Sequence, residues 1–358
     1  MMLKTRFLQE IYLISIKIMK RETKTILITG AAGFIGFHLS KKFLEKNWRV
    51  VGIDCISSYY DVKLKYSREK ILKGYKEYVP IHKKIEEQGV LYSIFEQHRP
   101  RIVVHLAAQA GVRHSICSPR EYLDSNIRGS FELLEAAKNF PPDHILFAST
   151  SSVYGANRNM PYRELDKADH QISFYAATKK SVEAIAHSYS HLFQIPITIF
   201  RFFTVYGPWG RPDMAYFKFT KSILEGSSID VYNNGVMKRD FTFIDDLIAG
   251  IILLSKYIPS NDPNMVMSEA DSLSRVAPYR LVNIGNSSPV SLKNFIASIE
   301  KATGIKAKKK MMPMQPGDVT ATWADGTLLH DLTGFTPNTD LAWGIQLFVD
   351  WYRTYYKL

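Results

Sequence analysis

The sequence predicts an α/β protein in which a doubly wound parallel sheet is followed by a smaller C-terminal domain. From Lys24 onward, short runs rich in Ile, Val and Leu alternate with helical patterns. Nearly continuous apolar runs indicate strands buried on both faces, and the helices between them require right-handed crossovers. After Gly207-Pro208 the alternation ends, and Pro, Gly and Asn separate short elements to about residue 330. Within this part, the polar stretch Pro259–Pro278 is expected to be a surface loop.

The alternation begins with a β-rich apolar run at Thr25–Thr29, which predicts the first strand. A helical pattern at Phe34–Lys46 separates it from a second strand at Arg49–Ile53. A helical stretch around Glu86–His98 then leads to a strand at Arg101–Leu106. Strand, helix and strand in this order are the crossover units of a parallel sheet.

The same order continues with a helix at Tyr122–Asn139, which ends before the helix-breaking pair Pro141-Pro142. A strand at His144–Ser149, a long helix at Phe174–Phe193 and a strand at Ile197–Phe202 follow. These segments extend the predicted sheet by two more crossover units.

The amino-acid composition excludes several other classes of protein. The 358 residues are 46% hydrophobic and 22% charged, which is typical of a globular protein. Two cysteines, Cys55 and Cys117, supply neither a disulfide framework nor a Cys-rich metal site, so we expect a reducing, cytoplasmic location and no metal. The formal net charge of +12 fits anionic ligands. No basic motif with interleaved aromatic residues accompanies this charge, so we do not expect nucleic-acid binding.

Residues 1–23 form a basic extension before the first strand. The apolar-leaning run Ile11–Ile16 is interrupted by Lys17 and is far shorter than the ~20 residues that span a bilayer. No small-residue cleavage site of a signal peptide follows it. We therefore expect no stable membrane insertion, although peripheral attachment through a basic amphipathic helix stays open.

The first strand continues directly into a glycine-rich turn, at which the first helix opens. Glycines at such a turn let backbone N–H groups approach a pyrophosphate at the helix N-terminus. Asp54 ends the second strand 18 residues after Gly36, where an acidic side chain accepts from ribose hydroxyls and repels a 2′-phosphate. This context predicts a Rossmann unit that binds NAD rather than NADP. The residues expected at the cofactor are Gly30, Gly33, Phe34, Ile35, Gly36 and Asp54.

Two further positions lie beside the same edge of the sheet. Small residues, including Ala107, follow the strand that ends near His105, and they leave room for a flat ring or a ribose. Asn126 opens or lies within the next helix. Both are candidate cofactor contacts, with tight packing and a helix cap as the structural alternatives.

Tyr175 and Lys179 are the candidate catalytic pair. Residues at i and i+4 share one face of a helix, so both can reach one ligand. A phenol titrates near ~10, so a base at neutral pH needs its anion stabilised, and an adjacent ammonium or an oxidised nicotinamide can contribute. The hydroxyl-rich segment that begins at Ser149-Thr150 ends a core strand and supplies a bridging hydroxyl.

With these residues, the chain resembles the extended short-chain dehydrogenase/reductase family of nucleotide-sugar enzymes, from Lys24 to the C-terminus. The resemblance implies that Tyr175 is the acid/base and that Lys179 lowers its pKa and holds the nicotinamide ribose. It implies that Thr150 is the hydroxyl relay and that Ser151 and Ser152 face the sugar. It also implies a homodimer, formed through helices at about residues 122–139 and 174–193.

Two local features separate the subfamilies. The 4,6-dehydratases carry an Asp-Glu pair where Ser151 and Ser152 stand, and UDP-glucuronate decarboxylases keep a Glu at the second position, so both reactions are disfavoured. The segment from Arg201 to Ala215, with Thr204 where UDP-galactose 4-epimerases usually have Asn, looks like the UDP-glucuronate 4-epimerases. That likeness implies that Thr150, Ser151, Ser152 and Thr204 hold the C6 carboxylate, with Arg211 nearby.

The same likeness places UDP near Arg239, whose fork of donors suits a diphosphate, and near Asp318, which can accept from ribose hydroxyls. We therefore expect NAD-dependent 4-epimerisation of UDP-glucuronate to UDP-galacturonate through a 4-keto intermediate. The alternatives are a 4-epimerase of a neutral or N-acetylated UDP-hexose, a UDP-glucuronate decarboxylase, or a non-catalytic NAD-binding protein. The expected domains are an NAD-binding one at 24–205 and a mainly UDP-sugar-binding one at 206–358, with some segments returning to the first.

Overall fold

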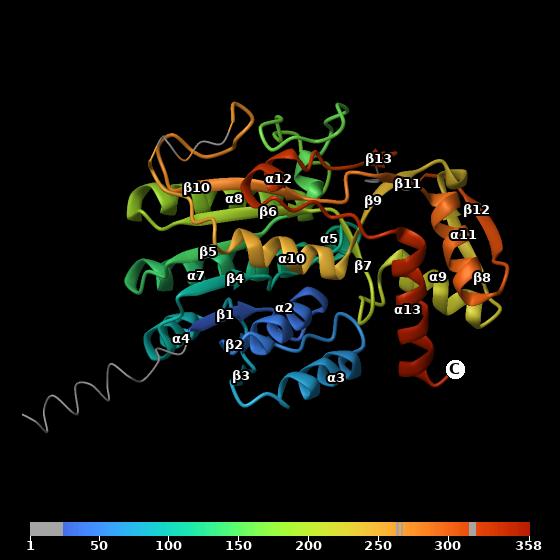
Figure 1. Ribbon diagram of the computed structural model, residues 1–358, viewed down its shortest axis with the longest axis horizontal. Helices are drawn as coiled ribbons and strands as arrows, with labels where there is room; N and C mark the ends of the chain where they lie inside the picture. Colours follow the sequence, from blue (N-terminus) through green and yellow to red (C-terminus); the bar gives the residue numbers. More distant parts are fainter. Residues whose placement is uncertain (1–23, 263–264, 266–267, 315–319) are drawn as a thin grey trace, which may run out of the picture.

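Figure 1 shows the computed structural model, which describes residues 24–358 except 263–264, 266–267 and 315–319. The predicted basic extension at residues 1–23 therefore lies outside the described residues, and so does Asp318. In the described part, a large sheet carries helices on both faces, and a smaller lobe stands beside it (Figure 1).

The large sheet has seven strands in the order β10-β6-β5-β4-β1-β2-β3, and all neighbouring strands are parallel. Its strands are β1 (Thr25–Thr29), β2 (Arg49–Ile53), β3 (Tyr78–Ile81), β4 (Ile102–His105), β5 (His144–Ala148), β6 (Ile197–Phe202) and β10 (Tyr279–Ile284). The predicted doubly wound sheet is confirmed, and the five strands expected from the sequence agree within one residue at each end. The strand order reverses at β1, because β2 lies on one side of it and β4 on the other.

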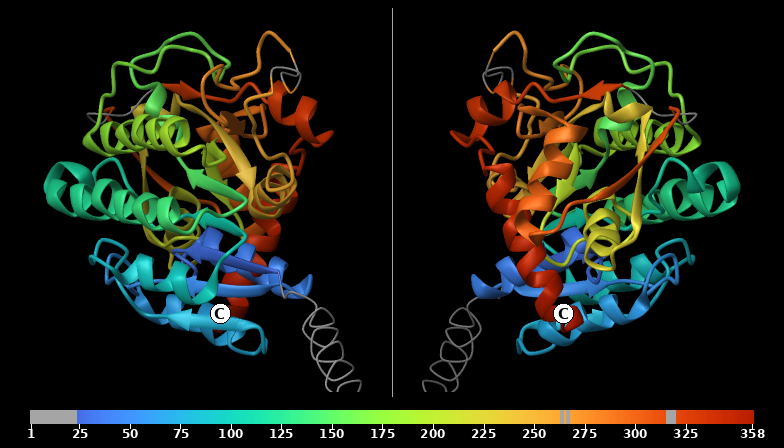
Figure 2. Two further views of the ribbon diagram at one scale, coloured as in Figure 1. Left: turned by 90° about the vertical axis from the view of Figure 1, so that its left-hand side faces the viewer. Right: turned by 90° about the vertical axis from the view of Figure 1, so that its right-hand side faces the viewer.

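Side-chain alternation along each strand builds two separate hydrophobic cores. Ile26 and Ile28 of β1 pack on one face, whereas Leu27 packs on the other. Figure 2 shows the resulting layers, with helices on either side of the sheet. The first face carries α2 (Phe34–Glu45), α3 (Val62–Leu72), α10 (Ile244–Leu254) and α12 (Thr327–Thr333); the second carries α4 (Val90–His98), α7 (Gly129–Asn139) and α8 (Phe174–Phe193).

Some elements differ from those expected. Helix α4 begins at Val90, because the preceding Gly89 adopts a left-handed conformation (φ 82°). The helix expected at Tyr122–Asn139 is divided into α6 (Pro119–Tyr122), a π-helical segment, η1 (Leu123–Arg128), and α7. Helix α3 and strand β3 were not anticipated, because α3 is rich in charged residues and β3 has only four residues, one of them Pro80.

The smaller lobe contains two short sheets. The first pairs β7 (Thr204–Tyr206), β11 (Pro289–Ser291) and β13 (Ala321–Thr322) with β9 (Lys238–Phe243). The second pairs β8 (Ser228–Tyr232) with β12 (Lys308–Met312). The lobe's helices are α9 (Ala215–Leu224), α11 (Leu292–Thr303) and α13 (Leu341–Tyr356); short α5 (His114–Cys117), η2 (Ser151–Tyr154) and η3 (Asn233–Gly235) complete the described elements.

The second half of the chain also contributes to the large sheet, since β10 pairs with β6 along six residues and α10 packs on the α2 face. The segment between α10 and β10, expected as a surface loop, has a buried anchor. Arg280 donates to the Asp271 carboxylate at 3.0 Å, and both side chains are almost wholly buried. Among the described residues, no helix is both long and apolar enough to cross a membrane.

Candidate active site

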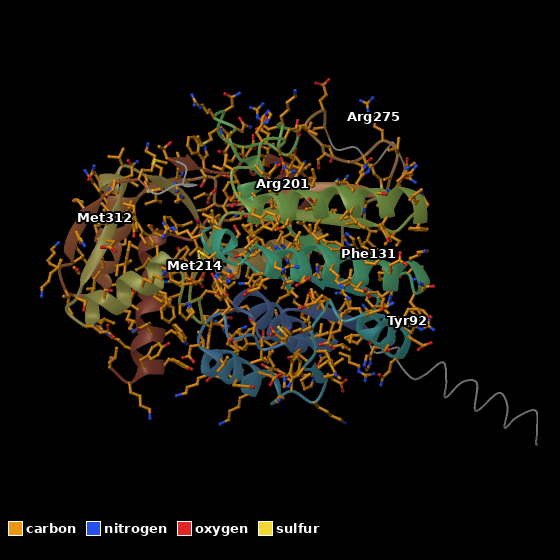
Figure 3. The ribbon with its side chains drawn as sticks, turned by 180° about the vertical axis from the view of Figure 1, so that it is seen from behind. Tyr92, Phe131, Arg201, Met214, Arg275 and Met312 are labelled. Atoms are coloured by element: carbon orange, nitrogen blue, oxygen red, sulfur yellow. The ribbon has the colours of Figure 1, made fainter. Side chains whose placement is uncertain are left out.

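A cavity of about 890 Å³ opens at the carboxyl ends of β1, β2, β4 and β5. This is the point where the strand order reverses, and ligands of open parallel sheets bind in the crevice at such a point. The glycine turn lies in its wall, and Tyr175, Lys179, Arg211 and Met214 also line it. Figure 3 shows Met214 between the helices of the large sheet and the smaller lobe.

The glycine turn requires glycine at two positions. Gly30 has φ 72°, and a Cβ there would lie 2.9 Å from the main-chain nitrogen of Ala107. A Cβ on Gly36 would collide with the carbonyl oxygen of Gly30. Gly30, Gly33, Phe34, Ile35 and Gly36 all line the cavity. The turn therefore brings bare main chain and the N-terminus of α2 to the cavity, an arrangement suited to a pyrophosphate.

Asp54 lies at the end of β2 and lines the same cavity. Its carboxylate accepts from the main-chain N–H groups of Ala32 (3.1 Å) and Ile56 (2.8 Å), one on each oxygen. Each oxygen keeps a second lone pair for a ribose hydroxyl. Three lysines that were not predicted from the sequence also line the cavity: Lys65, Lys83 and Lys84.

The two further cofactor candidates, Ala107 and Asn126, differ in whether they line the cavity. Ala107 lines the cavity, and its N–H donates to Thr29 Oγ1 at 3.0 Å. Asn126 is buried, with its side chain bonded to both main-chain groups of Gln109 (2.7 and 3.1 Å) and to Thr178 Oγ1 (3.0 Å). These contacts fix the loop after β4 against α8, and the described cavity wall does not include Asn126.

Tyr175 and Lys179 lie one turn apart near the start of α8, which begins where Ser173 Oγ accepts from the N–H of Ala176 (3.1 Å). Both side chains are buried and line the cavity. The Lys179 ammonium donates to the main-chain oxygen of Ala148 at 2.9 Å. This bond ties α8 to the end of β5, from which Thr150 follows.

The environment moves both pKa values. Burial lowers the pKa of Lys179 to about 8, against the opposing charge of Glu183. Burial raises the pKa of Tyr175, while a hydrogen bond with Thr150 and the charge of Arg211 act in the opposite direction. The protein without ligands therefore favours the neutral phenol. The expected lowering of the pKa of Tyr175 by Lys179 stays a prediction.

The hydroxyl-rich segment turns into η2 directly after β5. Thr150 Oγ1 accepts from the N–H of Ser152 (3.2 Å) and lies 3.3 Å from its hydroxyl, and Thr150 also hydrogen-bonds Tyr175. Thr204 begins β7 and pairs with Phe241 of β9. Its chain neighbours Phe203 and Val205 line the cavity, and Thr204 itself is half-buried.

Arg211 is paired within the protein. Its Nε and Nη2 donate to the two carboxylate oxygens of Asp213 at 3.0 and 2.6 Å, and its guanidinium lies 5.9 Å from the centre of the Tyr59 ring. This partner neutralises much of the charge that Arg211 brings to the cavity. Arg239 donates to the main-chain oxygen of Lys238 (2.9 Å) and is not part of the described cavity wall.

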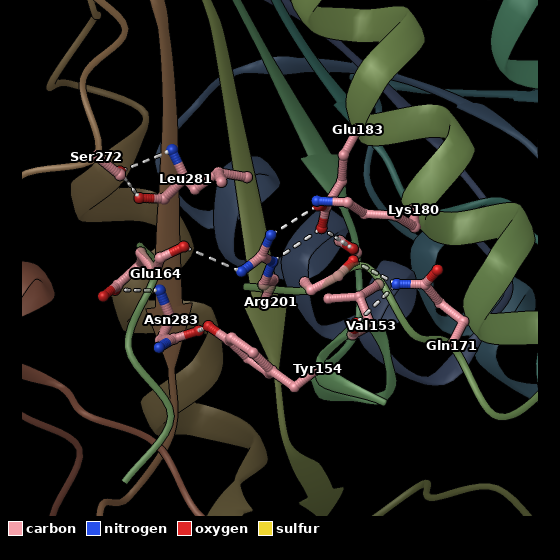
Figure 4. A network of polar contacts seen from close by, with 12 residues as sticks. Val153, Tyr154, Glu164, Gln171, Lys180, Glu183, Arg201, Ser272, Leu281 and Asn283 are labelled. Atoms are coloured by element: carbon pink, nitrogen blue, oxygen red, sulfur yellow. Dashed lines mark hydrogen bonds and ion pairs between the residues drawn. The ribbon is translucent and has the colours of Figure 1, made fainter. Parts of the chain in front are cut away.

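A buried polar network behind the catalytic helix was missed from the sequence. Arg201 of β6 makes a two-pronged ion pair with Glu183 of α8 (2.9 and 2.7 Å; Figure 4). Ser149 donates to the same carboxylate at 2.6 Å. The Arg201 guanidinium also lies 4.8 Å from the centre of the Tyr154 ring. Two signals could have predicted the pair: an arginine inside a largely apolar strand, and a glutamate one turn after Lys179.

Fold and site together define a dinucleotide-dependent enzyme of the doubly wound α/β class. The chain belongs to the NAD dependent epimerase/dehydratase family, whose model matches residues 26–267. A probable UDP-glucuronate 4-epimerase of Rhizobium meliloti is 49% identical over 333 residues, which cover 92% of this chain and 97% of that protein. UDP-glucuronate 4-epimerase 2 of Arabidopsis thaliana is 41% identical, over 96% of this chain and 79% of that one.

A solved structure shares the whole architecture. The UDP-glucuronic acid 4-epimerase from Bacillus cereus, in complex with UDP-glucuronic acid and NAD, superposes with a TM-score of 0.82 at 33% identity. The match covers 93% of this chain and 100% of that one. The fold is therefore that of a UDP-sugar epimerase, with the smaller domain included.

Proposed function

We propose that the protein is an NAD-dependent 4-epimerase that interconverts UDP-glucuronate and UDP-galacturonate. The observation that carries the proposal is the convergence of the glycine turn, the Tyr175–Lys179 face of α8 and Arg211 on one cavity. The relatives and the solved structure named above support the same substrate.

Each of the site residues has a separate role in the proposed reaction. The glycine turn, Asp54 and Ala107 would hold NAD, which would supply the hydride acceptor and donor. Tyr175, as the phenolate, removes the proton of the sugar 4-hydroxyl to become the phenol and later returns that proton, and Thr150 orients its oxygen through their hydrogen bond. Lys179, held on the Ala148 carbonyl, provides a positive charge beside the nicotinamide ribose. The sugar turns over between the two transfers while its UDP stays anchored.

The C6 carboxylate needs a particular kind of restraint. A 4-keto uronate is a β-keto acid that can lose CO₂, so the carboxylate must be held without preventing rotation of the ring. We assign this task to the hydroxyls of Thr150, Ser151, Ser152 and Thr204, with Arg211 nearby. Because Asp213 already occupies two donors of Arg211, the guanidinium offers the carboxylate a weakened charge. Arg239 and Asp318 are the proposed contacts to the UDP moiety.

The assay incubates the protein with UDP-glucuronate, UDP-glucose or UDP-N-acetylglucosamine and separates the products by chromatography. We expect UDP-galacturonate from UDP-glucuronate alone, with no decarboxylated pentose. Tyr175→Phe should lower turnover by about 100- to 10,000-fold, the usual contribution of a positioned acid/base. Tyr189→Phe is the matched control, since it changes the same residue type on the same helix and removes only a bond to Glu135 (2.6 Å).

Three outcomes would contradict the proposal. Conversion of UDP-glucose alone would indicate an epimerase of neutral hexoses, and accumulation of a UDP-pentose would indicate a decarboxylase. Full activity of Tyr175→Phe would remove the acid/base from the mechanism.

We further propose that the enzyme is a homodimer formed through η1, α7 and α8. Large apolar side chains are exposed along these helices: Leu123, Phe131, Phe174, Leu192 and Phe193 are between 37% and 64% exposed. Figure 3 views this face directly, with Phe131 labelled on α7. Clustered exposed apolar side chains are typical of an interface.

A further inference from the structure

Arg68, on α3, bridges two loops that line the active-site cavity. One guanidinium nitrogen, Nη1, donates to the main-chain oxygen of Ala32 in the glycine turn (3.0 Å) and to the Tyr60 hydroxyl (2.8 Å). The other, Nη2, donates to the main-chain oxygens of Trp209 (2.6 Å) and Gly210 (3.2 Å), in the loop after β7. A single side chain therefore connects the proposed cofactor turn with the segment that leads into Arg211.

The chemistry of this contact is unusual for a buried arginine. Arg68 is 0% exposed, and all four acceptors found for it are uncharged. Burying a cation without a carboxylate costs free energy, which Arg201 of the same protein avoids by pairing with Glu183. The planar fork of arginine reaches two loops at once, which the single ammonium of lysine does not do. The contact is therefore specific to this residue type.

The loop that Arg68 holds has a conformation that needs support. Trp209 has φ 62°, in the left-handed region that side chains rarely adopt. Its ring contacts Phe37 of α2 (5.4 Å) and Trp351 of α13 (5.3 Å), and His38 bonds the carbonyl oxygen of Pro208 at 3.0 Å. The Arg68 bond to the Trp209 carbonyl completes this support from the side of the cofactor turn.

The support continues to Arg211. A Cβ on Gly210 would collide with the Tyr216 hydroxyl, which accepts from the main-chain N–H of Arg211 at 3.1 Å. The Arg211 backbone is therefore fixed within two residues of the Arg68 contact. Any movement of the loop relative to the glycine turn would move the Arg211 guanidinium relative to the bound cofactor.

We propose that Arg68 is a positioning residue. By tying the glycine turn to the loop after β7, it places the Arg211 guanidinium where it can meet the carboxylate of the sugar. This proposal rests on the proposed function, because it takes a sugar carboxylate as the group that Arg211 meets. It assigns Arg68 no contact with either ligand.

The test measures binding of UDP-glucuronate and of UDP to the NAD-loaded protein by calorimetry, for wild type, Arg68→Lys, Arg211→Ala and the double variant. We expect Arg68→Lys to weaken UDP-glucuronate binding about tenfold, as the loss of a charge-assisted hydrogen bond does. UDP lacks the carboxylate, and its affinity should change by less than about twofold. In the Arg211→Ala background, Arg68→Lys should have no further effect, because coupled residues are not additive.

Arg353→Lys is the matched control, since Arg353 also donates to a main-chain oxygen, that of Thr303 (2.8 Å), which belongs to neither loop. Equal loss of affinity for both ligands, or additive effects in the double variant, would overturn the proposal. Should Arg68→Lys fail to fold, Tyr60→Phe removes one acceptor of the same guanidinium and must give the same selective loss to a smaller degree.

Failure of the proposed function has a different signature. In that case the wild-type protein would bind UDP-glucuronate no more tightly than UDP, or Arg211→Ala would leave both affinities unchanged. The Arg68 proposal alone fails when Arg211→Ala weakens UDP-glucuronate binding but Arg68→Lys does not, or when Arg68→Lys gives one of the two overturning results named above.

Discussion

Glu164 shows how strongly one buried carboxyl responds to its surroundings. Its side chain is 6% exposed and accepts from the main-chain N–H of Asn283 at 2.7 Å, while its own carbonyl accepts from Arg201 (Figure 4). Burial raises its pKa to about 7 from the ordinary 4.5. The folded protein therefore binds one more proton than the unfolded chain between these two pH values, and the stability that this provides is lost as the pH rises through 7.

Glu164→Gln should consequently stabilise the protein at pH 8 and change little at pH 5. The amide keeps an oxygen for Asn283 and carries no charge to bury. The shift from 4.5 to about 7 corresponds to a gain of at most about 3 kcal/mol at the higher pH. Melting temperatures at the two pH values measure the difference, with exposed Glu87→Gln as control. An equal change at both pH values would refute the reasoning.

The roles of single residues could be predicted from the sequence to different degrees. Tyr175 and Lys179 were predictable because their i, i+4 spacing on a helix is local and because the hydroxyl-rich segment from Ser149 supplies the context that the spacing alone lacks. The contacts of Arg68 join segments 36 and 141 residues apart along the chain, and no local pattern encodes such a pairing. Asn126 stays a predicted cofactor contact, but its bonds to Gln109 and Thr178 could not be recognised from its neighbours in sequence.

At the scale of elements, the junction of β1 with α2 is the most constrained segment of the site. Gly36→Ala forces a methyl group into the Gly30 carbonyl, so the turn must open. We expect a loss of about 1–3 kcal/mol of stability, as for other overpacked sites. The affinity for NAD should fall about tenfold, which corresponds to about 1.4 kcal/mol of binding free energy, and less NAD should copurify per chain, measured after denaturation.

Gly250→Ala is the matched control for this prediction. Gly250 is also helical and buried, but a Cβ there would meet Ile284 at an ordinary 3.4 Å. Alanine favours a helix interior over glycine, so this variant should keep its NAD and its stability. Full NAD retention by Gly36→Ala would show that the turn does not depend on glycine at that position.

Elements with strong periodicity were predictable, and those without it were not. The five expected strands agree with the structure because apolar, β-branched runs leave little ambiguity. Helix α3 was missed because Lys, Arg and Glu occupy much of it, and its contacts to the fold, such as Ser67 to Tyr355 of α13 (3.0 Å), come from the far end of the chain. The π-helical segment η1 has no recognisable sequence signal at all.

At the scale of the whole molecule, the proposed homodimer can be tested by placing a charge on one side chain of its interface. Phe131 is 43% exposed on α7, and Phe131→Glu would place a charge in an apolar interface. Light scattering should show twice the chain mass of 41.0 kDa for the wild type and the single mass for the variant. Tyr66→Glu, at a side chain that is 53% exposed on α3, should leave the dimer intact. A wild-type protein that scatters as a monomer would disprove the interface.

The position of β10 has a consequence for how the chain reaches its native state on the ribosome. Strand β6 is complete at residue 202, but its outer hydrogen-bonding edge stays open until residues 279–284 have been synthesised. An unpaired edge of this kind invites pairing with other chains. The newly made first half therefore emerges as an unfinished unit that depends on residues translated much later, and a truncated product ending near residue 205 should aggregate rather than accumulate as a separate domain.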